Sequence, residues 1–187
     1  MKPKIAQKIL KRLGWKCIPF IVTEPKAIIL GAPHTSIWDF VITYLYCISM
    51  GQKANVLIKD TFFFWPLGPI LKSLGGIPLK RGKGANFVLQ VISAFKSCDK
   101  LYLAIAVEGT RKPVKQWKAG FHTIAKATGV PVYLGIFDWG HKEVGSCEKF
   151  EITDDAKADL KKIRQWYKDR GVIGKYPEKF VTGDDLV

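Results

Sequence analysis

Short apolar runs alternate with segments of helical periodicity along most of the chain. The apolar runs predict buried strands at residues 27–31, 56–58, 77–79, 101–107 and 130–137. Helical spacing predicts helices at residues 37–50, 87–95 and 121–128, and a last helix capped by Thr153. Strands that alternate with helices are typical of an α/β domain. We therefore expect a mixed, largely parallel central sheet flanked by helices.

The first residues predict a basic amphipathic helix, within residues 1–14. Apolar side chains share one face of it: Ile5, Ala6, Ile9, Leu10 and Leu13. Basic side chains share the other: Lys4, Lys8, Lys11 and Arg12. Such a helix can lie on a membrane surface or pack its apolar side on the domain, and the pattern leaves both open.

Residues 61–74 form an unusually aromatic segment. Phe63, Phe64 and Trp65 stand beside Pro66, with further apolar residues on either side. One interpretation is a core segment or a short, broken helix. The other is an exposed apolar surface that contacts lipid through Phe63, Phe64 and Trp65.

The net charge narrows the choice of partner. The 187 residues suit a single domain spanning 1–187, with a frayed tail at 182–187. Thirty Lys and Arg against sixteen Asp and Glu give a formal net charge of +14. That excess favours a polyanionic partner, either nucleic acid or an anionic membrane surface, although a solvated basic surface would look the same.

The chain has no pattern that indicates insertion or export. Its four cysteines are far apart, so they predict no zinc or redox motif. No apolar run reaches the roughly 18 residues of a spanning helix, and no signal-peptide core follows the basic N-terminus. We expect a cytoplasmic protein, peripheral on the inner face of the membrane.

Three polar clusters directly follow apolar runs, at residues 34–39, 76–81 and 108–111. In open α/β sheets, sites form at the carboxyl ends of strands, so we expect the clusters at one rim. If Ser36 caps a helix, Asp39 lies in its first turn and can reach back to the imidazole of His34. A histidine oriented in this way is a general base. Alternatively, Asp39 only stabilises the helix N-terminus.

The other two clusters suit an anion. Arg81 follows a glycine turn and Arg111 follows Gly109-Thr110. An arginine fork binds phosphate or carboxylate, and adjacent glycines let backbone N–H groups approach the anion. Solvated surface charge is the alternative.

The motifs together resemble those of the glycerolipid acyltransferases, which include the lysophosphatidate acyltransferases. Those enzymes carry H-x4-D, G-x4-R, E-G-T-R and a V-P strand. Here the same order holds at His34–Asp39, Gly76–Arg81, Glu108–Arg111 and Val130–Pro131, within residues 27–137. The resemblance implies a glycerol-3-phosphate-acyltransferase-like fold.

The resemblance also implies roles for these residues. His34 would deprotonate an acceptor hydroxyl, and Asp39 would orient His34. The hydroxyl oxygen would then attack the thioester of acyl-CoA or acyl carrier protein, with no metal or cofactor. Arg81 would hold the phosphate of a lyso-lipid such as 1-acyl-glycerol-3-phosphate. The remaining substrate-binding residues would be Gly76, Glu108, Gly109, Thr110 and Arg111.

The chain departs from the family pattern beside the third motif. Ala106-Val107 replaces the usual aromatic-proline pair, and Lys112-Pro113 replaces a small polar residue. These departures concern the acceptor. Two other interpretations remain: a basic nucleic-acid-binding module without activity, and a serine hydrolase using Ser36, which lacks the G-x-S-x-G elbow.

Overall fold

The computed structural model describes residues 1–52, 55–73, 75–80 and 85–181. A five-stranded sheet in the order β1-β7-β6-β2-β5 occupies the centre. Its strands are β1 (Lys16–Cys17), β2 (Lys26–Ala32), β5 (Leu101–Ala106), β6 (Val132–Asp138) and β7 (Glu143–Phe150). All neighbours pair in parallel except β6 and β7, which are antiparallel. The expected mixed, largely parallel sheet is confirmed.

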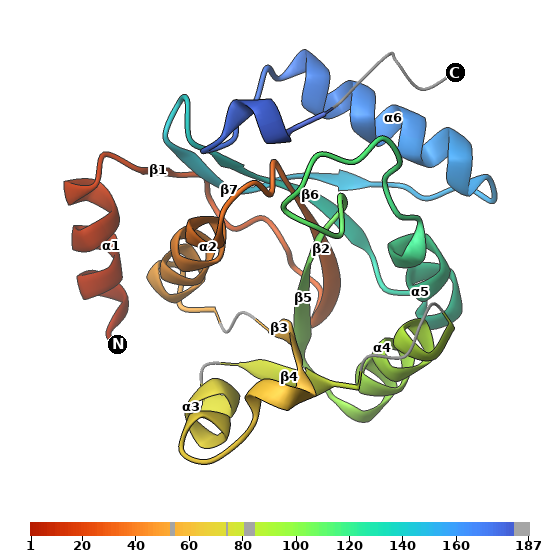
Figure 1. Ribbon diagram of the computed structural model, residues 1–187, viewed down its shortest axis with the longest axis horizontal. Helices are drawn as coiled ribbons and strands as arrows, with labels where there is room; N and C mark the ends of the chain where they lie inside the picture. The colour runs from red at the N-terminus through yellow and green to blue at the C-terminus, as the bar shows by residue number, and fades with distance from the viewer. Residues whose placement is uncertain (53–54, 74, 81–84, 182–187) are drawn as a thin grey trace.

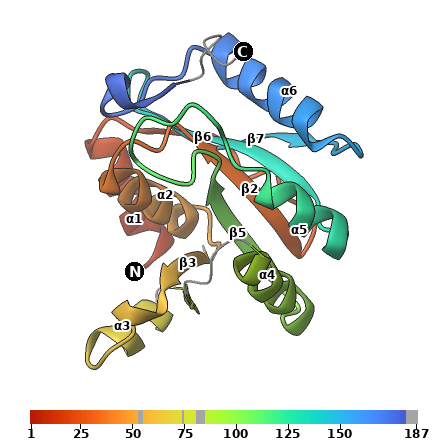
Figure 2. The same ribbon diagram turned by 45° about the vertical axis from the view of Figure 1, so that its right-hand side comes forward.

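Helices cover both faces of this sheet (Figures 1 and 2). On one face lie α4 (Ala85–Ser97), α5 (Gly120–Thr128) and α6 (Ala156–Asp169), which close the main core against β2, β5 and β6. On the other lie α1 (Pro3–Arg12) and α2 (Ile37–Ser49), which pack with β6 and β7. The layers follow from β2, whose residues are apolar on both sides, as a strand buried between two layers requires.

The register brings three strand ends to one level. Gly31 of β2 pairs with Ala106 of β5 and with Gly135 of β6. The buried hydroxyl of Tyr167, on α6, lies 2.9 Å from the carbonyl oxygen of Leu30 and 2.8 Å from that of Gly135. The carboxyl ends of β2, β5 and β6 therefore open onto the same rim, and Tyr167 bridges β2 and β6 just before it.

A smaller unit extends beyond the β5 edge. Parallel strands β3 (Val56–Lys59) and β4 (Gly76–Leu79) pair with each other, and Asn55 makes a parallel bridge to Leu103 of β5. Between them lie a 3-10 turn, η1 (Asp60–Phe62), and α3 (Leu67–Ser73), at the bottom of Figure 1. The aromatic segment is therefore a loop and a short helix. Within it, Phe64 and Trp65 are exposed and Phe63 is half-buried.

Helix α1 packs part of its apolar side on the domain, which is one of the two alternatives left open by its sequence. Ala6 and Leu10 are fully buried against the α2 side of the molecule. Ile5, Ile9 and Leu13 remain exposed along a neighbouring stripe. The basic side chains Lys4, Lys8, Lys11 and Arg12 are exposed on the rest of the helix surface. α1 therefore presents both a cationic and an apolar surface while it is packed on the domain.

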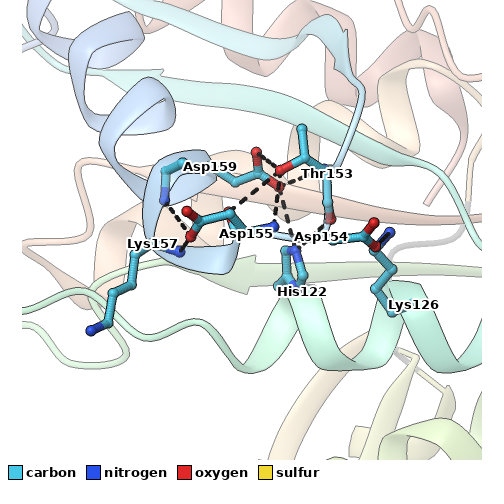
Figure 3. A network of polar contacts seen from close by, with 8 residues as sticks. His122, Lys126, Thr153, Asp154, Asp155, Lys157 and Asp159 are labelled. Atoms are coloured by element: carbon cyan, nitrogen blue, oxygen red, sulfur yellow. Dashed lines mark hydrogen bonds and ion pairs between the residues drawn. The ribbon is translucent and has the colours of Figure 1, made fainter.

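A buried polar network anchors α6 to α5 (Figure 3). Asp159 is fully buried and accepts hydrogen bonds from the Thr153 backbone at 2.7 Å and from its hydroxyl at 2.9 Å. Nε2 of His122 lies 3.0 Å from the Thr153 carbonyl and 3.4 Å from the Asp159 carboxylate. The predicted N-cap at Thr153 is wrong, because Asp155 is the N-cap of α6. Thr153 precedes the helix and donates to Asp159 in its first turn.

Candidate active site

The site begins where β2 and β5 end side by side. Beyond β2, the chain turns at Pro33 and reaches His34, and beyond β5 it reaches Glu108. The backbone N–H of His34 donates to Oε1 of Glu108 at 2.7 Å. Two of the clusters predicted to share one rim are thus in direct contact.

Asp39 is fixed by the start of α2. Ser36 is the N-cap, and its hydroxyl accepts the N–H of Trp38. Asp39 is the third helical residue and closes a capping box, because its Oδ2 accepts the N–H of Ser36 at 2.8 Å. Oδ2 also accepts the N–H of Thr35 at 2.8 Å. The sequence H-T-S-x-x-D therefore folds its acidic residue back over its own loop.

His34 and Asp39 form a pair. Nδ1 of His34 lies 3.1 Å from Oδ2 of Asp39. The Asp39 side chain is 1% exposed and that of His34 is 23% exposed. An ionised carboxylate only accepts hydrogen bonds, so in a pair with ionised Asp39 the donor is Nδ1, and Nε2 is the ring nitrogen free to take another proton. The arrangement orients an imidazole at a surface that a substrate can reach.

Glu108 is a buried carboxyl group with one unused oxygen. Burial raises its pKa from the ordinary value of about 4.5 to about 7, and the hydrogen bond from the His34 backbone opposes that rise. Oε2 has no hydrogen-bond partner among the described residues. The carboxyl group holds the His34 loop through this hydrogen bond, at a cost in desolvation.

The turn after Glu108 requires glycine. Gly109 has a φ of 65°, in the left-handed region. A Cβ there would lie 2.9 Å from Cδ and 3.3 Å from Nζ of Lys118, whose side chain crosses the turn. Arg111 is exposed, and Thr110 accepts the N–H of Lys112 through its hydroxyl. Lys118 is a cation beside the E-G-T-R motif that sequence reasoning missed.

The second motif is placed only in part. Gly75 lies in a turn and has a φ of 86°, Gly76 begins the predicted strand as β4, and Lys80 follows that strand. Arg81 lies outside the described residues. Among the described residues, hydrogen bonds join His34 both to Asp39 and to Glu108.

Two segments that sequence reasoning missed also reach the site. Trp139 follows β6 directly, and its Nε1 donates to Oδ1 of Asp39 at 2.7 Å. In the C-terminal segment the N–H of Tyr176 donates to the hydroxyl of Thr35 at 3.2 Å, while Gly174 packs against the same side chain. Trp139 could have been found, because the rule that places sites at the carboxyl ends of parallel strands applies equally to β6.

An apolar pocket lies between α2 and the sheet. Phe137 lines it, and the Phe137 ring lies edge-on to the His34 ring, with centroids 6.1 Å apart. From there its lining follows α2 through Thr43 to Cys47. Its small residues, Gly31 and Gly135 among them, belong to the strands. Among the described residues, no group of three or more His, Cys, Asp or Glu side chains is placed to hold a metal ion.

Comparison with known proteins decides the family. A sequence model of the family described as Acyltransferase matches residues 20–134, which include His34, Asp39 and Glu108. The chain belongs to the acyltransferase family. Its catalysed reaction is therefore the transfer of an acyl group.

The fold of this acyltransferase is similar to that of a solved member. The crystal structure of the 1-acyl-sn-glycerophosphate (LPA) acyltransferase PlsC from Thermotoga maritima matches with a TM-score of 0.58 and 14% sequence identity. The match covers 90% of this chain and 78% of that chain. A search among curated proteins found no match.

Proposed function

We propose that this acyltransferase moves a fatty acyl group from acyl-CoA or acyl carrier protein to a hydroxyl of a phosphate-bearing lyso-lipid such as 1-acyl-glycerol-3-phosphate. The observation that carries the proposal is the 3.1 Å contact between Nδ1 of His34 and Oδ2 of Asp39 in a member of the acyltransferase family. The likeness to an LPA acyltransferase supports the choice of acceptor.

The pair suits direct transfer without an acyl-enzyme. Nε2 of His34 takes the proton from the acceptor hydroxyl as its oxygen attacks the thioester carbonyl carbon. The imidazolium formed is stabilised by the Asp39 carboxylate, which is held by backbone donors. When the C–S bond breaks, the departing thiolate takes the proton from Nε2, so the base is restored.

The apolar pocket supports a fatty acyl group. A reacting carbonyl beside His34 would place its alkyl chain against Phe137 and into the space along α2. Removing an alkyl chain from water contributes about 0.8 kcal/mol for each buried methylene, so apolar walls of this kind favour an alkyl group over a polar one. Cys47 lies eight residues beyond Asp39 on α2, about 12 Å along the helix axis.

The acceptor phosphate would be held by basic side chains around Gly109. Arg111 and Lys118 are the described candidates, and Arg81 is the candidate from the second motif. A turn that only glycine fits lets backbone N–H groups approach an anion closely. Gly76, Glu108 and Thr110 would shape the same pocket.

Docking on an anionic leaflet completes the proposal. The cationic side chains Lys4, Lys8, Lys11 and Arg12 border the exposed apolar stripe of α1. Near α3, Trp65 is 84% exposed and Phe64 is 58% exposed, while Phe63 is half-buried. None of the helices in the described ranges is both long and apolar enough to cross a bilayer. We propose a peripheral enzyme on the cytoplasmic face.

The test is a panel of acceptors assayed with labelled acyl-CoA and acyl carrier protein. Lysophosphatidate, other lysophospholipids and monoacylglycerol, which lacks the phosphate, would be compared. We expect esterification of the phosphate-bearing acceptors and little transfer to monoacylglycerol. Equal transfer to monoacylglycerol would contradict the proposed acceptor.

A further inference from the structure

Asp39 is held by two separate sets of donors. Its Oδ2 faces the backbone of its own loop and Nδ1 of His34. Its Oδ1 accepts the indole N–H of Trp139 at 2.7 Å, from a residue 100 positions further along the chain. That bond is charge-assisted and joins a half-buried donor to a carboxylate that is 1% exposed.

The Trp139 ring is itself fixed from several sides. Its backbone N–H donates to the carbonyl of Ile173 at 2.8 Å. Its ring meets Trp15 edge-on, with centroids 5.0 Å apart. Nζ of Lys142 and Nζ of Lys175 each lie 4.7 Å from the ring centroid, within the range of a cation–π contact. These contacts together hold the indole ring in place, with its N–H directed at Oδ1 of Asp39.

We infer that Trp139 is a positioning residue of the active site, which holds the Asp39 carboxylate in the orientation that presents Oδ2 to His34. The inference rests on the proposed roles of His34 and Asp39. Without the indole N–H, Oδ1 would be a buried acceptor with no partner, and the carboxylate would turn to recover one. Such a turn carries Oδ2 away from Nδ1, and the base loses its alignment.

The indole could instead serve only as packing in the small core around Trp15. The two roles differ in what they do to turnover. A packing role predicts lower thermal stability with normal turnover. A positioning role predicts a lower kcat with nearly unchanged KM values, because Trp139 contacts Asp39 and not the substrates in this account.

The experiment replaces Trp139 by Phe, which keeps an aromatic ring and removes the N–H. Trp166→Phe is a matched control, since Nε1 of Trp166 also donates to a carboxylate, Oε2 of Glu148, at 2.7 Å, beneath the cation of Arg170. In Trp139→Phe we expect kcat to fall about 10- to 100-fold, with both KM values within about twofold. Trp166→Phe should keep the wild-type kcat.

A second variant guards against misfolding. Trp139→His retains a ring N–H, so it should recover part of the kcat that Trp139→Phe loses. A folded Trp139→Phe enzyme with wild-type kcat, or a Trp139→His enzyme no faster than Trp139→Phe, would overturn the positioning role. Activity in His34→Ala would instead refute the proposed function, so the two failures can be told apart.

Discussion

The backbone N–H of His34 donates to the side chain of Glu108 at 2.7 Å, which joins the first and third motifs through a single hydrogen bond. The strands that carry them are neighbours in register, so their ends cannot shift independently. Glu108 thus sets the height of the His34 loop over the sheet. Its raised pKa makes this support dependent on pH.

The first prediction concerns that dependence. The pKa of Glu108 is raised from about 4.5 to about 7 by burial, so the folded state binds this proton more tightly than the unfolded state does. Stability from this group is therefore present below pH 4.5 and is lost as pH rises through about 7, by up to about 3 kcal/mol. Glu108→Gln stays neutral. Its melting temperature relative to wild type should rise between pH 5 and pH 8.

The control for this measurement is Glu151→Gln, which neutralises an exposed carboxylate. Thermal unfolding of the three proteins across that pH range gives the comparison. A Glu108→Gln difference from wild type that stays constant from pH 5 to pH 8 would show that Glu108 does not titrate in this window.

The second prediction concerns the acceptor phosphate. Arg81→Ala and Arg111→Ala should each raise the acceptor KM about 10- to 100-fold and leave the donor KM nearly unchanged, because a charge-assisted bond contributes about 1.5–3 kcal/mol. Lys115→Ala removes an exposed cation of the Arg111–Lys118 loop and serves as the control. If neither Arg81→Ala nor Arg111→Ala changes the acceptor KM, the proposed phosphate site is wrong.

The third prediction concerns acyl chain length. Cys47 is buried and lines the pocket. Cys47→Phe should shorten that pocket and lower the rate with long-chain donors relative to short-chain donors, by about fourfold for each excluded methylene. Cys98→Phe makes the same change on the opposite side of the sheet, where Cys98 packs against the main core. If both variants keep the wild-type preference, the acyl chain does not occupy this pocket.

The fourth prediction concerns membrane docking. Wild-type protein should sediment with anionic vesicles and be released by salt, because each basic residue near the surface contributes about 1 kcal/mol that salt screens. A triple serine variant at Ile5, Ile9 and Leu13 should lose a part of binding that salt does not affect. Phe64→Ser with Trp65→Ser should behave in the same way.

Leu89→Ser is the control for docking, since Leu89 is exposed on α4, on the opposite side of the sheet from α1. If all folded variants sediment like wild type, the docking surface is elsewhere. Retention on nucleic acid at moderate salt, with none on vesicles, would revive the nucleic-acid-binding alternative.

The sequence predicted the layers and the contact between His34 and Asp39 because both depend on local patterns. Apolar runs marked β2 and β5, and the Ser36 cap placed Asp39 within reach of His34. Strand β7 was missed. Its residues Glu143–Phe150 include Gly145, Glu148 and Lys149, so no apolar run marks a strand that pairs with β6 at the sheet's antiparallel side.

Contacts between distant segments could not be predicted in the same way. The bond from Trp139 to Asp39 and the packing of Gly174 on Thr35 join residues more than 90 positions apart, and no local spacing encodes them. The hydrophobic pattern of α1 also could not predict which of its apolar residues stay exposed. An amphipathic helix shows that it has an apolar face, but only packing shows how much of that face is covered.

The most direct test of the account is the rate of acyl transfer to lysophosphatidate by wild type, His34→Ala and Asp39→Asn. His141→Ala is the control, because Nδ1 of His141 pairs with Asp138 at 2.7 Å in the same manner on an exposed turn. We predict that His34→Ala loses about 10²- to 10⁴-fold in kcat, that Asp39→Asn is also severely impaired, and that His141→Ala keeps its activity. Wild-type turnover by a folded His34→Ala enzyme would contradict the account.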